Sequence, residues 1–146
     1  PVIYNCGGYE SVDTLRSLEG LVDIYLPDLK YADNRLGKAL SAVPDYFEVA
    51  TAAIREMVRQ TGSPVWEGQR LRRGVVIRHL ILPGYVENSL KVLDWIGETF
   101  APGQVLVSLM RQYTPMPGMP APLDRTVTEE EYQSVEKEFR EQIYIL

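Results

Sequence analysis

Hydrophobic residues along the chain fall into two kinds of segment, and these alternate. Short, continuous apolar runs bounded by Gly, Pro or Asp are typical of strands. Four such runs are present: Val2–Asn5, Leu21–Leu26, Val75–Leu82 and Val105–Met110. The third run is apolar at most positions, as expected of a parallel strand that other elements cover on both faces.

The segments between these runs carry apolar residues at helical spacing, together with residues that start helices. Ser11 and Asp13 are the two candidates for the cap of a short first helix. Pro44 suits the first turn of a longer one, and Thr128 with Glu131 forms the pattern of a capping box. The predicted helices cover residues 11–18, 44–61, 89–100 and 129–142.

This alternation predicts an α/β fold. Connections of more than ten residues between successive strands favour parallel pairing, because an antiparallel pair needs only a short turn. Two segments do not fit the alternation. Ser63–Arg73 is turn-rich and predicts either an irregular strand or a hairpin extension. The proline-rich stretch Thr114–Leu123 predicts an ordered loop over the site.

Composition narrows the class of protein. With 146 residues, 45% of them hydrophobic, the chain can bury one core, so a single domain over residues 1–146 is expected. A net charge of −5 without a basic stripe argues against nucleic-acid binding, and no apolar run approaches the roughly 18 residues that span a bilayer. The single cysteine excludes an internal disulfide and favours a reducing, cytoplasmic setting.

Polar residues follow the ends of three predicted strands. Three of the apolar runs lead into the segments Asp28-Leu29-Lys30, Leu82-Pro83-Gly84 and Gln112-Tyr113. In parallel α/β sheets and barrels, binding sites form at the carboxyl ends of the strands. The sequence therefore predicts a site that these segments share.

The segments around these strand ends resemble a known family. The motifs NCGGY (5–9), VDIYLPDLKY (22–31), IRHLILPG (77–84) and QYTP (112–115), in this order, are similar to radical S-adenosylmethionine (radical SAM) proteins of the pyruvate formate-lyase activating enzyme group. The resemblance covers nearly the whole chain.

The resemblance implies a fold and a chemistry. The fold would be a partial TIM-type (β/α) barrel, of which this chain forms a carboxyl-terminal fragment of four parallel strands. In the intact oxidoreductase a [4Fe–4S] iron–sulfur cluster and S-adenosylmethionine generate a 5′-deoxyadenosyl radical that abstracts hydrogen, for this group from a partner glycyl radical enzyme. The cluster ligands would lie in an earlier Cys-x-x-x-Cys-x-x-Cys motif, so we expect this fragment to be inactive alone.

Lys30 is the first candidate for cofactor binding. A lysine ammonium at the end of a strand can neutralise a ligand carboxylate in a partly dry cleft. The alternative is an ordinary surface lysine. In the family pattern Asp28-Leu29-Lys30, the resemblance favours contact with the carboxylate of S-adenosylmethionine.

Asp28 and Asn5 match positions of a monovalent-cation site in the family. Cys6 occupies a third position, where a thiol is a poor ligand for a hard cation. The alternative for Asp28 is that its carboxylate holds Lys30 or caps the next turn.

Arg78 and His79 lie on one predicted strand and so point to opposite faces. At most one of them can reach the site, and we expect Arg78 to do so, as the partner of a buried carboxylate or of the cofactor. The only histidine is expected to be packed and hydrogen-bonded.

Gln112 and Tyr113 are placed like the family's contacts to the nucleoside, although such a pair before prolines is also typical of a structured turn.

A second hypothesis belongs to another class of function. The same sheet could serve a non-enzymatic ligand-binding or protein-interaction module, because a fold does not fix a function. Under either hypothesis the first predicted strand is a sheet edge, and an unpaired edge invites pairing with another chain. We therefore expect the chain to self-associate, either through the Val2–Asn5 edge or through the open mouth of the barrel.

Overall fold

The computed structural model describes residues 1–142 and side chains through Phe139. Its centre is a parallel sheet of four strands, β1 (Ile3–Cys6), β2 (Ile24–Pro27), β4 (Arg70–Leu80) and β5 (Leu106–Met110). Their order in the sheet is β1-β2-β4-β5, which follows the order along the chain. The short strand β3 (Val65–Glu67) pairs antiparallel with the start of β4, so the sheet has five strands in all. The predicted α/β class and the parallel pairing are confirmed.

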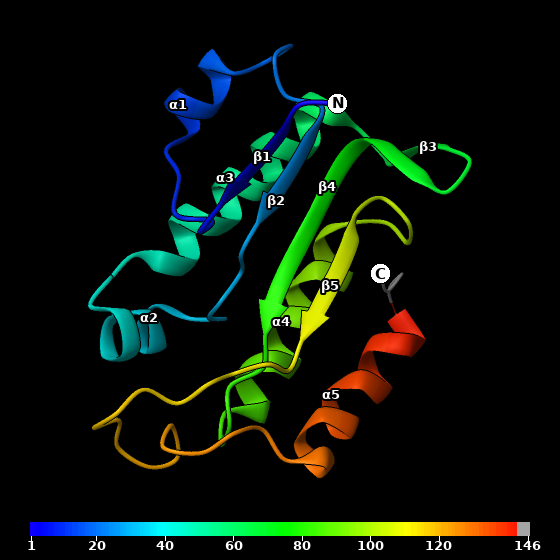
Figure 1. Ribbon diagram of the computed structural model, residues 1–146. Coiled ribbons are helices and arrows are strands. Elements are labelled where there is room, and N and C mark those ends of the chain that lie inside the picture. Colours follow the sequence, from blue (N-terminus) through cyan, green and yellow to red (C-terminus); the bar gives the residue numbers. More distant parts are fainter. Residues whose placement is uncertain (143–146) are drawn as a thin grey trace.

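The helices gather on one side of this sheet. They are α1 (Val12–Ser17), α2 (Asn34–Ser41), α3 (Tyr46–Thr61), α4 (Val86–Thr99) and α5 (Glu129–Gln142). Figure 1 shows α3 and α4 behind the strands and α5 beside α4. The main hydrophobic core joins side chains of α1, α3, α4 and α5 to one face of the strands. We call this the covered face and the opposite side the open face.

Strand alternation assigns residues to the two faces. On β4, Val75, Ile77 and His79 are fully buried and point to the covered face. Val76, Arg78 and Leu80 point to the open face, together with Ile24, Asp28, Leu106 and Met110 on the neighbouring strands. Ile24, Val76 and Leu106 are almost inaccessible but lie outside the main core cluster. The open face therefore carries its own, smaller apolar layer.

Most predicted elements are present, with shifted ends. Ser11 is the cap of α1, since its hydroxyl accepts the Thr14 amide at 3.0 Å. The capping box of α5 is also confirmed, because Thr128 and Glu131 bond each other's backbone amides at 2.9 and 3.1 Å. The second strand begins at Ile24 rather than Leu21, because Leu21 belongs to the turn that ends α1 and is 65% exposed. The fourth helix begins at Val86, three residues before the predicted start.

Two parts of the fold differ more from the prediction. The predicted strand Val75–Leu82 covers the second half of the longer β4, which ends at Leu80 rather than Leu82. The first half of β4 forms a hairpin with β3. Helix α2 was not predicted, because Gly37 in its middle is a poor helix former. A Cβ at Gly37 would lie 2.7 Å from the Cβ of Tyr46, so close packing of α2 on α3 requires the glycine.

No helix within residues 1–142 is both long enough and apolar enough to cross a membrane.

Candidate functional site

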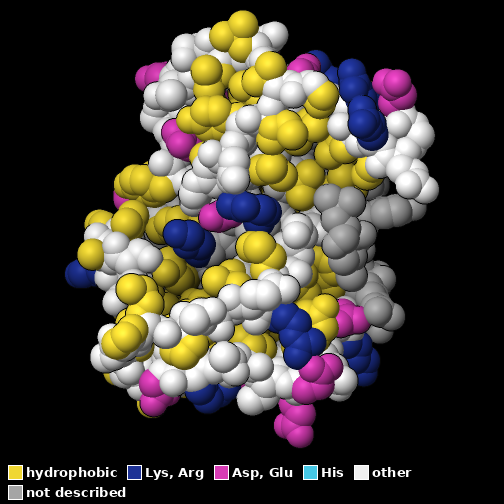
Figure 2. Space-filling model, viewed as in Figure 1, with side chains coloured by type: hydrophobic (Ala, Val, Ile, Leu, Met, Phe, Trp, Pro, Cys, Tyr) yellow, Lys and Arg dark blue, Asp and Glu magenta, His cyan; other side chains and the backbone are white. Residues whose placement is uncertain are grey.

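Strands β2, β4 and β5 end beside one cavity on the open face. It has a volume of about 250 Å³. Its lining combines three charged side chains with an apolar wall: Asp28, Lys30, Tyr31, Arg78, Leu80, Leu82 and Met110. Figure 2 views the molecule from this side and shows charged side chains set among apolar ones. The cavity lies where the strand ends predicted a site, and two of the three predicted segments reach it.

Asp28 and Arg78 form an ion pair at this cavity. Both Nε and Nη2 of Arg78 donate to Oδ1 of Asp28, each at 2.7 Å. The two residues are partners across β2 and β4, so alternation points both side chains to the open face. Their side chains are 21% and 29% exposed. Arg78 thus takes the first of its two predicted roles, and the Asp28 carboxylate holds Arg78 rather than Lys30.

Lys30 brings an unbalanced positive charge to the cavity. Its side chain is exposed, and none of the described carboxylates lies within ion-pair distance of its ammonium group. Because Asp28 already balances Arg78, the three charged groups leave one net positive charge. The cavity is therefore suited to an anionic ligand group.

His79 takes no part in this cavity. It is fully buried on the covered face, where Nδ1 lies 2.7 Å from the Leu29 carbonyl oxygen and Nε2 lies 2.8 Å from Oγ of Ser89. A carbonyl can only accept, so Nδ1 carries the proton and Nε2 accepts from the Ser89 hydroxyl. Burial lowers the pKa of His79 to about 4, so the ring is neutral near pH 7. The prediction of a packed, hydrogen-bonded histidine is confirmed.

Of the predicted cation ligands, only Asp28 lines the cavity. Asn5 is exposed on β1 and does not line the cavity, and the Asp28 carboxylate is engaged by Arg78. Cys6 packs against the main core, and burial raises the pKa of its thiol. A cation at Asp28 would have to compete with a guanidinium, and the Cys6 thiol keeps its proton.

Gln112 and Tyr113 lie outside the cavity lining. Gln112 is exposed, and the Tyr113 hydroxyl donates to the Leu123 carbonyl oxygen at 2.8 Å. The proline-rich loop that follows packs on the turn after β4, where a Cβ at Gly84 would lie 2.2 Å from Cγ of Pro122. The predicted loop thus contacts Tyr113 and the turn at Gly84, but none of its residues lines the cavity.

Several residues that line or support the cavity were not among the candidate site residues chosen from the sequence. Met110 ends β5 and Tyr31 follows the DLK segment, so both carried the signal of a strand end. Gly8 permits the loop after β1 to approach the site, because its φ is +84° and a Cβ there would lie 2.0 Å from the Asp28 carbonyl oxygen. Tyr46 and Asn88 bond the backbone beneath the cavity from two helices, and no local sequence signal marks them.

The side chains fit the two implied cofactors differently. Lys30 and the apolar wall suit the carboxylate and methylene groups of an amino-acid ligand. Within the described part of the chain, by contrast, no three His, Cys, Asp or Glu residues lie close enough to hold a metal ion. These residues therefore do not fit an iron–sulfur cluster.

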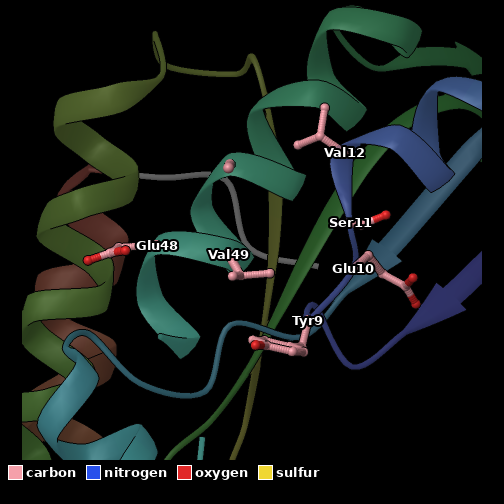
Figure 3. A pocket seen from close by; sticks show the side chains of 7 residues that line it. Tyr9, Glu10, Ser11, Val12, Glu48 and Val49 are labelled. Carbon is pink, nitrogen blue, oxygen red and sulfur yellow. The ribbon is translucent and has the colours of Figure 1, made fainter. Parts of the chain in front are cut away.

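A second hollow lies between the segment before α1 and helix α3. Tyr9, Val12, Val49 and Ala52 give it an apolar lining, with Glu10 and Glu48 at its edges. Figure 3 shows the two glutamates on opposite sides, pointing away from each other. Since its polar groups do not converge, this hollow is a weaker candidate than the cavity at the strand ends.

No protein-family model matches the chain. Among curated proteins it is similar to "Uncharacterized protein MJ0674" of Methanocaldococcus jannaschii, with 29% identity over 116 residues. The aligned part makes up 79% of this chain but 30% of that relative. The chain thus spans less than a third of the curated relative it matches, whose name states no activity.

Proposed function

We propose that the cavity binds the amino-acid end of S-adenosylmethionine, and that the chain belongs to a radical SAM enzyme similar to the pyruvate formate-lyase activating enzymes. One observation carries the proposal. An ammonium group without a carboxylate partner among the described residues lines a cavity at the carboxyl ends of parallel strands. Sequence motifs of the family surround the same three strands.

The architecture supports this choice over other α/β folds. In a doubly wound sheet the strand order reverses at a switch point and helices cover both faces. Here the parallel strands keep their chain order, and the main core lies on one face. These features support a stretch of (β/α) barrel, in which the site lies at the carboxyl ends of the strands.

Different residues of the chain would contact different parts of the ligand. Lys30 neutralises the ligand carboxylate, and Leu80, Leu82 and Met110 contact the methylene and sulfonium carbons. The Asp28–Arg78 pair closes the polar end of the cavity without adding net charge. When bound, the iron–sulfur cluster and S-adenosylmethionine would together abstract a hydrogen atom from a substrate. For this group the substrate is a glycyl radical enzyme. The proposal places the cluster ligands outside this sequence.

One observation supports the alternative of a non-enzymatic ligand-binding module. The described lining of the cavity contains no Ser, Cys or His, since His79 points to the covered face, and the Asp28 carboxylate is already held by Arg78. We therefore assign the chemistry of the enzyme to the cofactor. A Cys-x-x-x-Cys-x-x-Cys motif encoded upstream of Pro1 supports the enzyme, whereas an upstream region without it leaves a ligand-binding module.

Ligand binding can be tested on this chain directly. We expect S-adenosylhomocysteine, a stable analogue, to shift the backbone amide NMR signals of residues 28–31, 80–82 and 110. Lys30→Ala should weaken the affinity about tenfold, the effect of losing one charged hydrogen bond. Lys38→Ala is the matched control, because Lys38 is an exposed lysine on α2 away from the cavity.

Two results would count against the proposal. Shifts confined to the hollow at Tyr9 and Val49 would move the ligand to another site. Equal affinity of the Lys30→Ala and Lys38→Ala variants would remove Lys30 from the binding site.

A further inference from the structure

The segment Asp28–Ala32 leaves the sheet, yet its backbone is almost fully hydrogen-bonded. A backbone that leaves a strand loses its ladder partners, and buried N–H and C=O groups must find others. Here the amides of Asp28 and Leu29 donate to the carbonyl oxygens of Cys6 and Arg78, at 3.1 and 2.9 Å. The remaining partners are side chains from three other elements.

Tyr46 of α3 holds the segment on both sides of Leu29. Its hydroxyl accepts the Lys30 amide at 2.8 Å and donates to the Asp28 carbonyl oxygen at 3.3 Å. The ring is buried, with 3% exposure, and packs edge-on against Tyr31. Burial raises the pKa of Tyr46, so its hydroxyl keeps the proton that it donates.

Asn88 of α4 holds the segment on both sides of Tyr31. Its Nδ2 donates to the Lys30 carbonyl oxygen at 3.0 Å, and its Oδ1 accepts the Ala32 amide at 2.7 Å. His79 of β4 donates to the Leu29 carbonyl oxygen between these two contacts. Every backbone polar group from the Asp28 amide to the Lys30 carbonyl therefore has a partner.

We infer that Tyr46, His79 and Asn88 are positioning residues, which clamp the backbone of Asp28–Ala32 so that the Lys30 ammonium meets its anionic ligand at a fixed distance from Arg78. This inference rests on the proposed function and adds a determinant of affinity that never touches the ligand. The three clamping side chains contact the segment from the covered side. β4 supplies both His79 and Arg78, so one strand fixes the clamp and the charged pair together.

The physical basis is preorganisation. Lysine has a long, flexible side chain, and the ordering of its backbone before binding lowers the entropy lost when the ion pair forms. Removing one clamping bond leaves every charge at the cavity in place. Affinity should then fall because Lys30 is less well held, while electrostatic attraction is unchanged.

Tyr46→Phe tests the clamp with the smallest change in shape. We expect hydrogen exchange of the Lys30 amide to become at least tenfold faster and affinity for S-adenosylhomocysteine to fall three- to tenfold. Tyr25→Phe is the matched control, because it removes an equally buried hydroxyl that donates to Gln60 at 2.6 Å, away from the cavity. This control should leave both quantities at wild-type values.

Asn88→Leu gives an independent second test. It should speed exchange of the Ala32 amide and weaken the same ligand, whereas Thr61→Val, which removes another buried hydroxyl, should do neither. Faster exchange with unchanged affinity, in a protein whose wild type binds the analogue, would overturn the inference and leave the proposed function intact. Exchange equal to that of the controls would also overturn it. A wild type that does not bind the analogue would instead overturn the proposed function.

Discussion

Arg78 and His79 are neighbours on one strand, and they serve opposite faces of the sheet. His79 is fully buried, neutral, and bonded through both ring nitrogens to groups of the protein. Arg78 is charged and 29% exposed, and it reaches solvent beside its partner Asp28. These two consecutive residues of β4 therefore differ in role. His79 stabilises the fold, whereas Arg78 is available to a ligand.

The difference follows from what covers each face. Helices pack on one side of the sheet, so a polar group there needs a hydrogen-bond partner within the protein. Without a partner, its desolvation lowers the stability of the fold. On the open side, solvent screens charges and leaves room for a ligand. We expect substitutions on the covered face to change mainly stability, with affinity changing as well at the clamping residues Tyr46, His79 and Asn88. Substitutions at the cavity should change binding with little effect on stability.

His79→Leu should have the largest effect. It leaves the Leu29 carbonyl and the Ser89 hydroxyl buried without partners, and each such group costs about 1–3 kcal/mol. We expect the free energy of unfolding to fall by about 3 kcal/mol, measured by urea denaturation. A loss below about 1 kcal/mol would show that the network on the covered face is not a major source of stability.

The same histidine predicts a pH dependence. In the unfolded chain His79 titrates near its ordinary pKa of about 6.5, whereas in the fold its pKa is about 4. Between these values the unfolded state binds more protons, so stability should fall as pH drops from about 6.5 to about 4, by up to about 1.4 kcal/mol per unit.

Glu131 does not obscure the upper part of that window. Its ion pair with Arg125 lowers the pKa of Glu131 to about 2, so its contribution is lost only as pH falls below about 4.5. Between pH 6.5 and 4.5, the slope should be shallower in His79→Leu than in the wild type. Equal slopes in the two proteins would refute a neutral, buried His79.

Arg78→Met should have a smaller effect on stability. Partly exposed ion pairs contribute about 0–1 kcal/mol, so we expect urea denaturation to show a loss within that range. Binding of S-adenosylhomocysteine should nevertheless weaken, because an unpaired Asp28 would attract Lys30 away from the ligand carboxylate. A loss of stability as large as that of His79→Leu would contradict the expected difference between substitutions on the covered face and substitutions at the cavity.

Ile3→Lys should change association rather than stability. β1 is the edge of the parallel sheet, and Val2 and Ile3 are 55% and 54% exposed. We expect the parent chain to form larger species as concentration rises, and the variant to remain a monomer, because a charged side chain blocks edge pairing. Light scattering across a concentration series measures this. A parent that is monomeric throughout would contradict self-association at this edge.

The sequence predicted the covered face better than the details of the cavity. Apolar spacing located α3 and α4, and a continuous apolar run located the second half of β4, because burial imposes such patterns directly. The capping box located α5. Alternation separated Arg78 from His79, and the strand-end rule selected Asp28 and Lys30. All of these are local signals.

The remaining features depend on contacts between distant segments. Nothing near Asn88 indicates that its amide bonds residues 30 and 32, and only the fold brings α4 to that segment. Helix α2 was missed because a tertiary contact with Tyr46 outweighs the low helix propensity of Gly37. Gln112 followed the strand-end rule, yet the chain turns away from the cavity after β5.

The central claim is that the Lys30 ammonium meets a ligand carboxylate in the cavity. The most direct measurement compares S-adenosylhomocysteine with its decarboxylated analogue, on the wild type and on Lys30→Ala. The account predicts that the wild type binds the carboxylate form about tenfold more tightly and that Lys30→Ala binds both forms alike. An equal preference in the two proteins would contradict it, because the carboxylate would then be recognised somewhere other than at Lys30.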